Sequence, residues 1–285
     1  KMIKYLGRKN ILDADIFFEK FCENKLKENE ICLTFDDAIK CQFDIALPVL
    51  EELKIKSFFF VYTSIFENNP DYLEIFRYFR MNYFDDVDKF YKKFYQFLDR
   101  DLNSFFNLNN NKIKKLKIKF PNYSIEDIKF RLVRDNFLTK NEYEKTMFKM
   151  LKEKKVNYKN LFTQLFFQKE HLKTLDKLGH LVGLHSHKHP TSIEKLSYDE
   201  QKSEYEKCQS LISTILNKPK DQIQCMSHPC GSYNNDTIEI LKELQIKLGF
   251  KQIMTIEPEK GMKKINNSSL EIARKNHCEI MTEMN

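Results

Sequence analysis

The chain has 285 residues, of which 41% are hydrophobic and 31% charged, with only 6 glycines and 7 prolines. This length allows one large domain or two small ones around a sizeable core, and the composition excludes a disordered tail, a coiled coil and a collagen-like repeat. The formal net charge of +7 favours anionic partners. Its 48 basic and 41 acidic residues are too evenly mixed to indicate a nucleic-acid surface, so no nucleic-acid partner is expected.

Two features bear on the cellular setting. The densest apolar run, residues 57–62, is far shorter than the ~20 residues of a membrane-spanning helix, and no signal-peptide pattern opens the chain. The seven cysteines are odd in number and contain no Cys-x-x-Cys pair, which disfavours a disulfide framework and a structural zinc finger. The sequence therefore predicts a cytoplasmic protein without a transmembrane segment.

The first part of the chain alternates between strand and helix patterns. Residues 31–35 form a short apolar run that ends at two acidic residues, as a buried strand does when it reaches the rim of a sheet. Apolar residues then recur at helical spacing over 43–53, and residues 56–62 form an aromatic and β-branched run. A strand, helix and strand in this order predict a parallel sheet or barrel.

The pattern changes to amphipathic helices from residue 67 to residue 166. Phenylalanine and tyrosine recur at steps of three and four residues between 76 and 98. The asparagine-rich stretch 107–111 and Pro121 divide this region. Residues 112–119 are a basic run that fits either a strand or a helix face. We predict that 67–166 is a helical insertion.

Alternation of helix and strand returns after this segment. The predicted elements are a helix at 172–178, a strand at 181–184, a helix at 205–216, a strand at 223–226 and a helix at 237–248. Because the same alternation precedes the insertion, residues 1–66 and 167–285 are predicted to form one interrupted α/β barrel or sheet domain.

Chemically informative residues lie just beyond the predicted strands, at the rim where catalytic groups of α/β folds gather. Asp36 and Asp37 follow the first strand. Adjacent carboxylates repel each other unless a positive charge or a shared proton compensates. By themselves they also fit a solvated turn in which aspartate caps a helix.

A second segment is rich in histidine. Four of the seven histidines lie within ten residues, at positions 180, 185, 187 and 189. Imidazole is the commonest neutral metal ligand in proteins, and a cluster of four after a strand is hard to explain as isolated core or surface residues. The cluster predicts a metal site.

A third segment, 227–234, contains a Pro-x-Gly turn after a predicted strand. Such a turn exposes backbone N–H groups, which an oxyanion hole requires. Alone, the segment also fits an ordinary loop.

Together the three segments resemble the motifs of the polysaccharide deacetylase family, the NodB-homology group of carbohydrate esterases. Residues 34–37 resemble its first motif, 185–190 its second motif of the form His-Ser/Thr-x-x-x-His-Pro, and 226–233 a variant of its third that continues Gly-Ser-Tyr-Asn. The resemblance covers about residues 30–65 and 168–260. It implies a distorted (β/α) barrel, which in this chain carries a large helical insertion.

The resemblance also implies a metal centre. Asp37, His185 and His189 would hold one divalent ion, most commonly Zn²⁺, with open positions for water and substrate. Asp36 would act as the general base on the attacking water, and the backbone N–H of Cys230 would stabilise the oxyanion.

The remaining roles that the resemblance implies are less directly matched. His228, Pro229 and Tyr233 are the candidate substrate contacts. Where the family usually has an arginine that orients the base, this chain has a serine at 227, and Arg274 is the candidate for the missing charge. The catalytic acid of the family lies in a late apolar strand, for which His277 is the nearest candidate and His228 a competitor.

The leading hypothesis is a metal-dependent hydrolase that removes an acetyl or formyl group from the nitrogen of an amino sugar. A nucleotide-linked or lipid-linked intermediate of surface polysaccharide biosynthesis fits the cytoplasmic prediction and the positive charge. One alternative is a different metal-dependent hydrolase that uses His185, His187 and His189, which would share one face of a strand. The other is a degenerate, non-catalytic member that binds sugar or protein. No oligomeric state is predicted.

Overall fold

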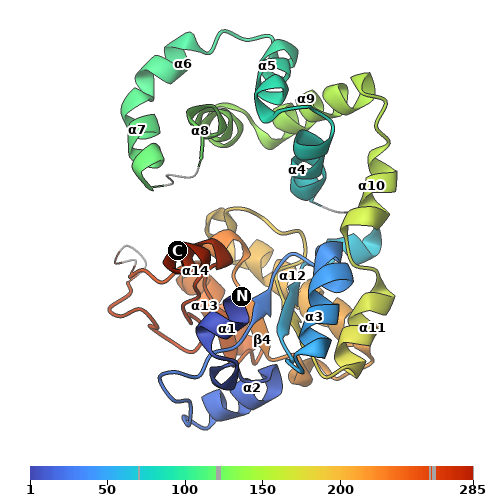
Figure 1. Cartoon of the computed structure of the whole chain (residues 1–285), viewed down its shortest axis with the longest axis vertical. Helices are drawn as coiled ribbons and strands as arrows, with labels where there is room; N and C mark the ends of the chain where they lie inside the picture. The colour runs from blue at the N-terminus through green and yellow to red at the C-terminus, as the bar shows by residue number, and fades with distance from the viewer. Residues whose placement is uncertain (70, 120–122, 257, 259–260, 285) are drawn as a thin grey trace. The chain divides into compact units, whose positions relative to one another are not determined.

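The computed structural model describes residues 1–69, 71–119, 123–256, 258 and 261–284. The chain divides into two compact units (Figure 1): Lys1–Asp71 together with Leu165–Asn285, and Tyr72–Gln164. The second unit lies inside the segment 67–166 that was predicted as an insertion. Pro121, one of the predicted breaks, lies outside the described residues.

A parallel sheet forms the centre of the first unit. Within the described residues it has five strands, which pair in chain order and make a half-barrel. The strands are β1 (Thr34–Phe35), β2 (Phe58–Val61), β3 (Leu181–Leu184), β4 (Cys225–Ser227) and β5 (Leu248–Phe250). Because all five run in the same direction, their carboxyl ends meet along one edge. The predicted strand at 31–35 is shorter than expected, since Ile31 instead forms an isolated bridge with Ile11.

Strand β2 is buried on both faces. Phe58, Phe59, Phe60 and Val61 are all fully inaccessible to solvent, which explains their unbroken apolar run. Because side chains alternate between the two faces, Phe58 and Phe60 stack with each other, at 5.8 Å between ring centroids, while Phe59 stacks on Phe35 on the other face.

Helices surround this sheet (Figure 1). The α-helices of the unit are α1 (Met2–Leu6), α2 (Ala14–Cys22), α3 (Leu47–Glu52), α11 (Lys169–Lys177), α12 (Tyr198–Leu216), α13 (Asn235–Glu243) and α14 (His277–Glu283). Short helical turns are η1 (Arg8–Asn10), η2 (Gln42–Ala46), η3 (Ser64–Glu67), η5 (Ile193–Lys195), η6 (Lys220–Gln222) and η7 (Pro229–Gly231). Helix α12 packs on β3 and on its neighbours α11 and α13.

The prediction of one continuous helix over 237–248 is wrong. Helix α13 ends at Glu243, and Leu248 begins strand β5. Gln245 adopts a left-handed φ of 61°, and the N–H of Ile246 bonds back to the carbonyl of Leu241, which closes the helix. The last apolar residues of the pattern therefore belong to the sheet.

The second unit is entirely helical within the described residues. Its elements are α4 (Tyr72–Asn82), α5 (Val87–Leu98), α6 (Asn103–Leu108), α7 (Asn110–Lys119), α8 (Ile125–Leu132), η4 (Val133–Phe137), α9 (Lys140–Glu153) and α10 (Tyr158–Leu165). The basic run at 112–119 is thus helical. Phe90, Phe94 and Phe130 form a buried aromatic core, with Phe130 at 5.3 and 5.0 Å from the other two rings. None of the helices in the described ranges is long and apolar enough to cross a membrane.

Candidate metal centre and active site

The turn after β1 carries the two adjacent acids. Asp37 and Ala38 both have left-handed backbone conformations, with φ of 75° and 53°. This conformation is uncommon for residues other than glycine and costs free energy, so the surrounding structure must hold the turn in place. Strand β1 pairs with β2, and β2 pairs with β3, which places this turn at the same edge as the loop after β3.

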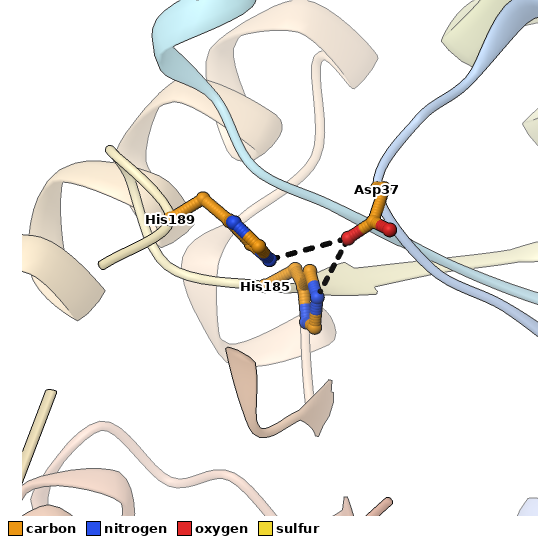
Figure 2. A group of neighbouring side chains, drawn as sticks. All are labelled: Asp37, His185 and His189. Atoms are coloured by element: carbon orange, nitrogen blue, oxygen red, sulfur yellow. Dashed lines mark ion pairs between the residues drawn. The ribbon is translucent and has the colours of Figure 1, made fainter. Parts of the chain in front are cut away.

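Three side chains converge at that edge. The Nε2 atoms of His185 and His189 lie 3.1 and 3.2 Å from the same oxygen of Asp37, Oδ1 (Figure 2). One ligand atom from each of the three residues lies within 4.8 Å of the others, which allows them to bind one metal ion. They are the three residues that the family resemblance implies as metal ligands: Asp37 from the first motif, and His185 and His189 from the second.

The loop between the two histidines is tightly held. Ser186 and His189 have left-handed φ angles of 63° and 56°, and the N–H of His189 donates to Ser186 Oγ at 3.1 Å. Glu204, a 9% exposed residue of α12, accepts the N–H groups of His187 and Lys188 on its Oε2 atom at 3.0 and 2.7 Å. A single buried carboxylate thus anchors the loop that presents both imidazoles.

The ring of His185 has a defined orientation. Its Nδ1 atom lies 2.8 Å from the carbonyl oxygen of Ser227. A carbonyl only accepts hydrogen bonds, so Nδ1 carries a proton, and Nε2 is the ring nitrogen that faces Asp37. This is how metal-binding histidines are usually fixed.

Electrostatics within this group favour a positive charge between the three residues. Burial by itself would raise the pKa of Asp37, but hydrogen bonds from His185 and His189 lower it well below the ordinary value. Burial would lower the pKa of His189, but the hydrogen bond with Asp37 and its charge raise it. The carboxylate therefore attracts a cation, which can be a protonated imidazole or a metal ion.

His187 lies apart from this group. Residues 185–189 follow β3 and do not extend it, so their alternation does not place three imidazoles on one face. The Nδ1 atom of His187 lies 2.9 Å from Thr63 Oγ1, and its Nε2 atom 3.4 Å from a carboxylate oxygen of Glu67. Burial lowers the pKa of His187 to about 4, with a further contribution from Lys207, so its ring is neutral at physiological pH.

Asp36 is held by an arginine from the far end of the sequence. Arg274 donates from Nη1 to Asp36 Oδ1 at 2.8 Å and from Nη2 to Asp36 Oδ2 at 2.6 Å. The same guanidinium is fixed by the carbonyl of Lys251 through Nε and by Thr34 Oγ1 through Nη1. Burial alone would raise the pKa of Asp36, but the charges of Arg274 and His185 lower it below the ordinary value.

The turn after β4 contains the remaining third-motif residues. Cys230 is exposed and has a left-handed φ of 53° within η7, next to the buried Pro229. His228 is buried, with Nε2 at 2.8 Å from the carbonyl of Leu270 and its ring stacked on Tyr233 at 4.3 Å. Tyr233 is 2% exposed, so these two rings form the underside of the turn.

His277 is the first residue of α14 and is exposed. It lies beyond the isolated bridge between Ile272 and β5 and is therefore not in a strand. Its Nε2 atom contacts Cys278 Sγ at 3.3 Å. The structure thus brings together the candidate base and the three candidate metal ligands, and it places this candidate acid on a helix start at the surface.

Glu204 is the residue of the site that sequence reasoning missed. The sequence feature that could have identified it is an acidic residue on the buried face of α12, where its neighbours are Gln201, Tyr205 and Cys208. A charged residue is almost never fully buried without partners, so its position predicts a specific bonding role.

Comparison with known proteins assigns the family. The family model for polysaccharide deacetylase matches residues 23–78 and 132–249, which is more than half of the chain. The chain belongs to the polysaccharide deacetylase family, which makes it a carbohydrate deacetylase by class, and the predicted resemblance is confirmed. Among curated proteins, none matches the sequence.

Solved structures with a similar fold include three bacterial proteins. The deacetylase PplD of Streptococcus pyogenes, in complex with acetate, is 15% identical, with a TM-score of 0.51 over 96% of this chain and 77% of that chain. The BpsB deacetylase domain of Bordetella bronchiseptica is 12% identical, with a TM-score of 0.52 and coverage of 96% and 82%. IcaB from Ammonifex degensii is 13% identical, with a TM-score of 0.52 and coverage of 99% and 84%. These likenesses confirm the distorted (β/α) barrel.

Proposed function

We propose that the protein is a metal-dependent hydrolase that removes an N-acyl group, acetyl or formyl, from an amino sugar. The observation that carries the proposal is the convergence of Asp37, His185 and His189 next to a second carboxylate, Asp36, which an arginine holds ionised. A metal site beside an ionised carboxylate supplies both requirements for activating water against an amide.

The residues fit a divalent ion, which we propose to be zinc. Two imidazole nitrogens and one carboxylate oxygen make three protein ligands, the number that leaves a position open in catalytic zinc sites. The bond from His185 Nδ1 to Ser227 supports this fit, because it leaves Nε2 available. When bound, such an ion acidifies a water molecule and polarises the carbonyl of the substrate.

The protein's own residues would then carry the proton transfers. Asp36 accepts a proton from water as the oxygen attacks the amide carbon, and Arg274 keeps that carboxylate oriented toward the water. The backbone N–H of Cys230 donates to the oxygen that gains negative charge. The C–N bond breaks as the nitrogen takes a proton, for which His277 is the proposed donor. The products are a carboxylate and a free amino sugar.

The finer part of the proposal concerns the substrate. We propose an amino sugar linked to a nucleotide or a lipid, on the way to a surface polysaccharide and in the cytoplasm. The exposed Cys230 would lie against the sugar, and the buried residues His228, Pro229 and Tyr233, predicted as substrate contacts, would support its turn from below. The net charge of +7 supports a phosphate-bearing substrate. The irregular cysteine spacing supports the reducing compartment.

The test is hydrolysis of a defined panel. Purified protein with added Zn²⁺ is incubated with N-acetyl and N-formyl amino sugars, each free, nucleotide-linked and lipid-linked, and acetate, formate and primary amine are measured. We expect release that depends on Zn²⁺ and is lost in Asp36→Asn. Asp44→Asn, an exposed acid paired with Lys40, is the matched control and should retain activity. Absence of release from every substrate would overturn the proposal, and sugar binding without release would favour the non-catalytic alternative.

A further inference from the structure

The helical unit contains a hollow whose wall carries four arginines. Arg77 and Arg80 come from α4, Arg131 comes from α8, and Arg134 comes from η4. Among the described residues, no acid lines this hollow. The hollow is formed within the second unit alone, and it stands independently of the proposed hydrolase activity.

The most buried part of the wall is organised by one carboxylate. Asp127 accepts from Arg80 Nη1 on Oδ1 at 3.0 Å and from Arg131 Nε on Oδ2 at 2.7 Å. The hydroxyl of Tyr91 also donates to Oδ1, at 2.7 Å. Asp127 is not among the residues that line the hollow. It therefore fixes two guanidinium groups without occupying the space between them.

The other two arginines are anchored in the same way. Arg134 donates from Nε and Nη2 to the two oxygens of Asp135, at 2.6 and 2.8 Å, and Arg77 pairs with Glu74 at 2.6 Å. Neither acid lines the hollow. A guanidinium has five N–H donors, and these contacts use one or two of them on each arginine, so donors remain for a ligand.

One donor at this wall has no partner. The Nε atom of Arg80 is buried and makes no hydrogen bond to any residue in the described part of the chain, although only 12% of the Arg80 side chain is exposed. Such a group costs free energy unless a ligand or water accepts from it.

We propose that this hollow is a binding site for a phosphate group. Four guanidinium groups are more than a carboxylate ligand would need, because one bidentate contact satisfies a carboxylate. A phosphate offers several charged oxygens, and these match the paired N–H donors of arginine side chains. Phe76, Phe130 and Tyr143 complete the wall. Aromatic walls exclude water and strengthen the contact between the charges. The ligand is free phosphate or the phosphate of a larger molecule.

The test uses calorimetric titration of the full chain with inorganic phosphate, with pyrophosphate, and with a nucleotide-linked and an unlinked N-acetyl amino sugar. Arg77→Gln/Arg134→Gln is the informative variant, because it leaves the Asp127 cluster intact. Each lost charged hydrogen bond should weaken phosphate binding by roughly tenfold or more. Lys114→Gln/Lys115→Gln on α7 removes the same charge from exposed positions and should bind like the native protein. Circular dichroism checks that each variant is folded.

Each outcome either supports or overturns the proposed phosphate site. Binding of inorganic phosphate or pyrophosphate that the arginine variant alone loses supports the site. Binding of the nucleotide-linked sugar that is tighter than that of phosphate, and that the arginine variant also loses, identifies the phosphate as part of a larger ligand, and equal binding identifies free phosphate. No binding of any phosphate probe at millimolar concentration, or an equal loss in the lysine variant, overturns the proposal. None of these results depends on whether the protein hydrolyses an amide.

Discussion

Arg274 and Asp36 form a two-point ion pair across 238 positions of sequence, with N–O distances of 2.8 and 2.6 Å. Ser227 lies between them: its Oγ atom accepts from Arg274 Nη2 at 2.8 Å and donates to Asp36 Oδ2 at 3.1 Å. The third motif usually supplies an arginine at the position of this serine. The small serine side chain leaves space for the guanidinium of Arg274, which comes from the C-terminal segment. A positive charge beside the proposed base is therefore retained, but it comes from a different place in the chain.

Replacing Arg274 should therefore reduce catalysis without removing the metal. A lysine cannot reproduce a bidentate contact, so Arg274→Lys should lower kcat by about tenfold or more. This loss is part of the roughly 10²- to 10⁴-fold rate enhancement that a positioned general base contributes. Rates and zinc content are measured on the same preparation. Arg100→Lys, which alters an arginine that pairs with Glu142 in the helical unit, is the control and should match the native enzyme. A normal rate in Arg274→Lys would exclude the positioning role.

The metal ligands make a second prediction. Asp37→Ala, His185→Ala and His189→Ala should each lose the ion, which we expect at about one per chain. His187→Ala should keep it, because that ring contacts Thr63 and is not one of the three side chains that converge at Asp37. Elemental analysis of dialysed protein measures both. Loss in His187→Ala with retention in Asp37→Ala would instead favour the three-histidine hydrolase.

Glu204 should act on the metal through the loop that it anchors. Glu204→Ala removes the acceptor for two backbone N–H groups between the ligands, and changes of this kind typically weaken metal affinity by about 10- to 100-fold. Glu204→Gln keeps an oxygen acceptor and should recover most of that loss. Titration of the apoprotein with Zn²⁺ measures the affinity. Glu206→Ala, an exposed acid two residues away on α12, should have no effect. Equal affinity in all three variants would remove Glu204 from the site.

The sequence indicated those parts of the site in which the chemistry is local. Asp36 and Asp37 are adjacent, His185 and His189 are four residues apart, and each pair follows an apolar run that the structure shows as a strand. Parallel strands bring such ends to one edge, so their convergence could be expected before any coordinates were known.

Other parts depend on tertiary packing that no local pattern records. Arg274 could be proposed as the partner of Asp36 only because the site needs a positive charge. The spacing of two residues so far apart in the sequence does not predict that they meet. The apolar stripe of α13 continues without a break into Leu248, although residues 244–247, with the left-handed Gln245 among them, separate the helix from the strand. The bonding role of Glu204 requires knowing which loop lies over α12.

The close packing at β3 makes a prediction about stability. A methyl group on Gly183 would lie 2.5 Å from the carbonyl oxygen of Cys225 and 2.8 Å from a ring carbon of Phe60. Both neighbours are in adjacent strands and cannot move freely, so Gly183→Ala should destabilise the barrel by about 1–3 kcal/mol. Denaturant unfolding followed by circular dichroism measures this change. Ser203→Ala, at an exposed position of α12, should leave the midpoint unchanged.

The stability of the helical unit should depend on pH through Asp127. Burial alone would raise the pKa of this carboxyl, but hydrogen bonds from Arg131 and Tyr91 lower it below its ordinary value of 3.8. A depressed pKa in the folded state means that the ionised form contributes stability above about pH 4, and that this contribution is lost as the pH falls through the lower, folded-state value.

Amide hydrogen exchange in α8, measured from pH 7 to pH 3 and corrected for intrinsic rates, reports this dependence. In native protein the protection of α8 should fall at the acidic end. Asp127→Asn should be less protected at pH 7, by on the order of 2 kcal/mol, because two arginines lose a charged acceptor, and it should show a smaller further loss in acid. Glu126→Gln, a neighbouring acid that pairs with Lys129 at the surface, is the control. The same acid dependence in Asp127→Asn as in native protein would mean that other carboxyl groups are responsible.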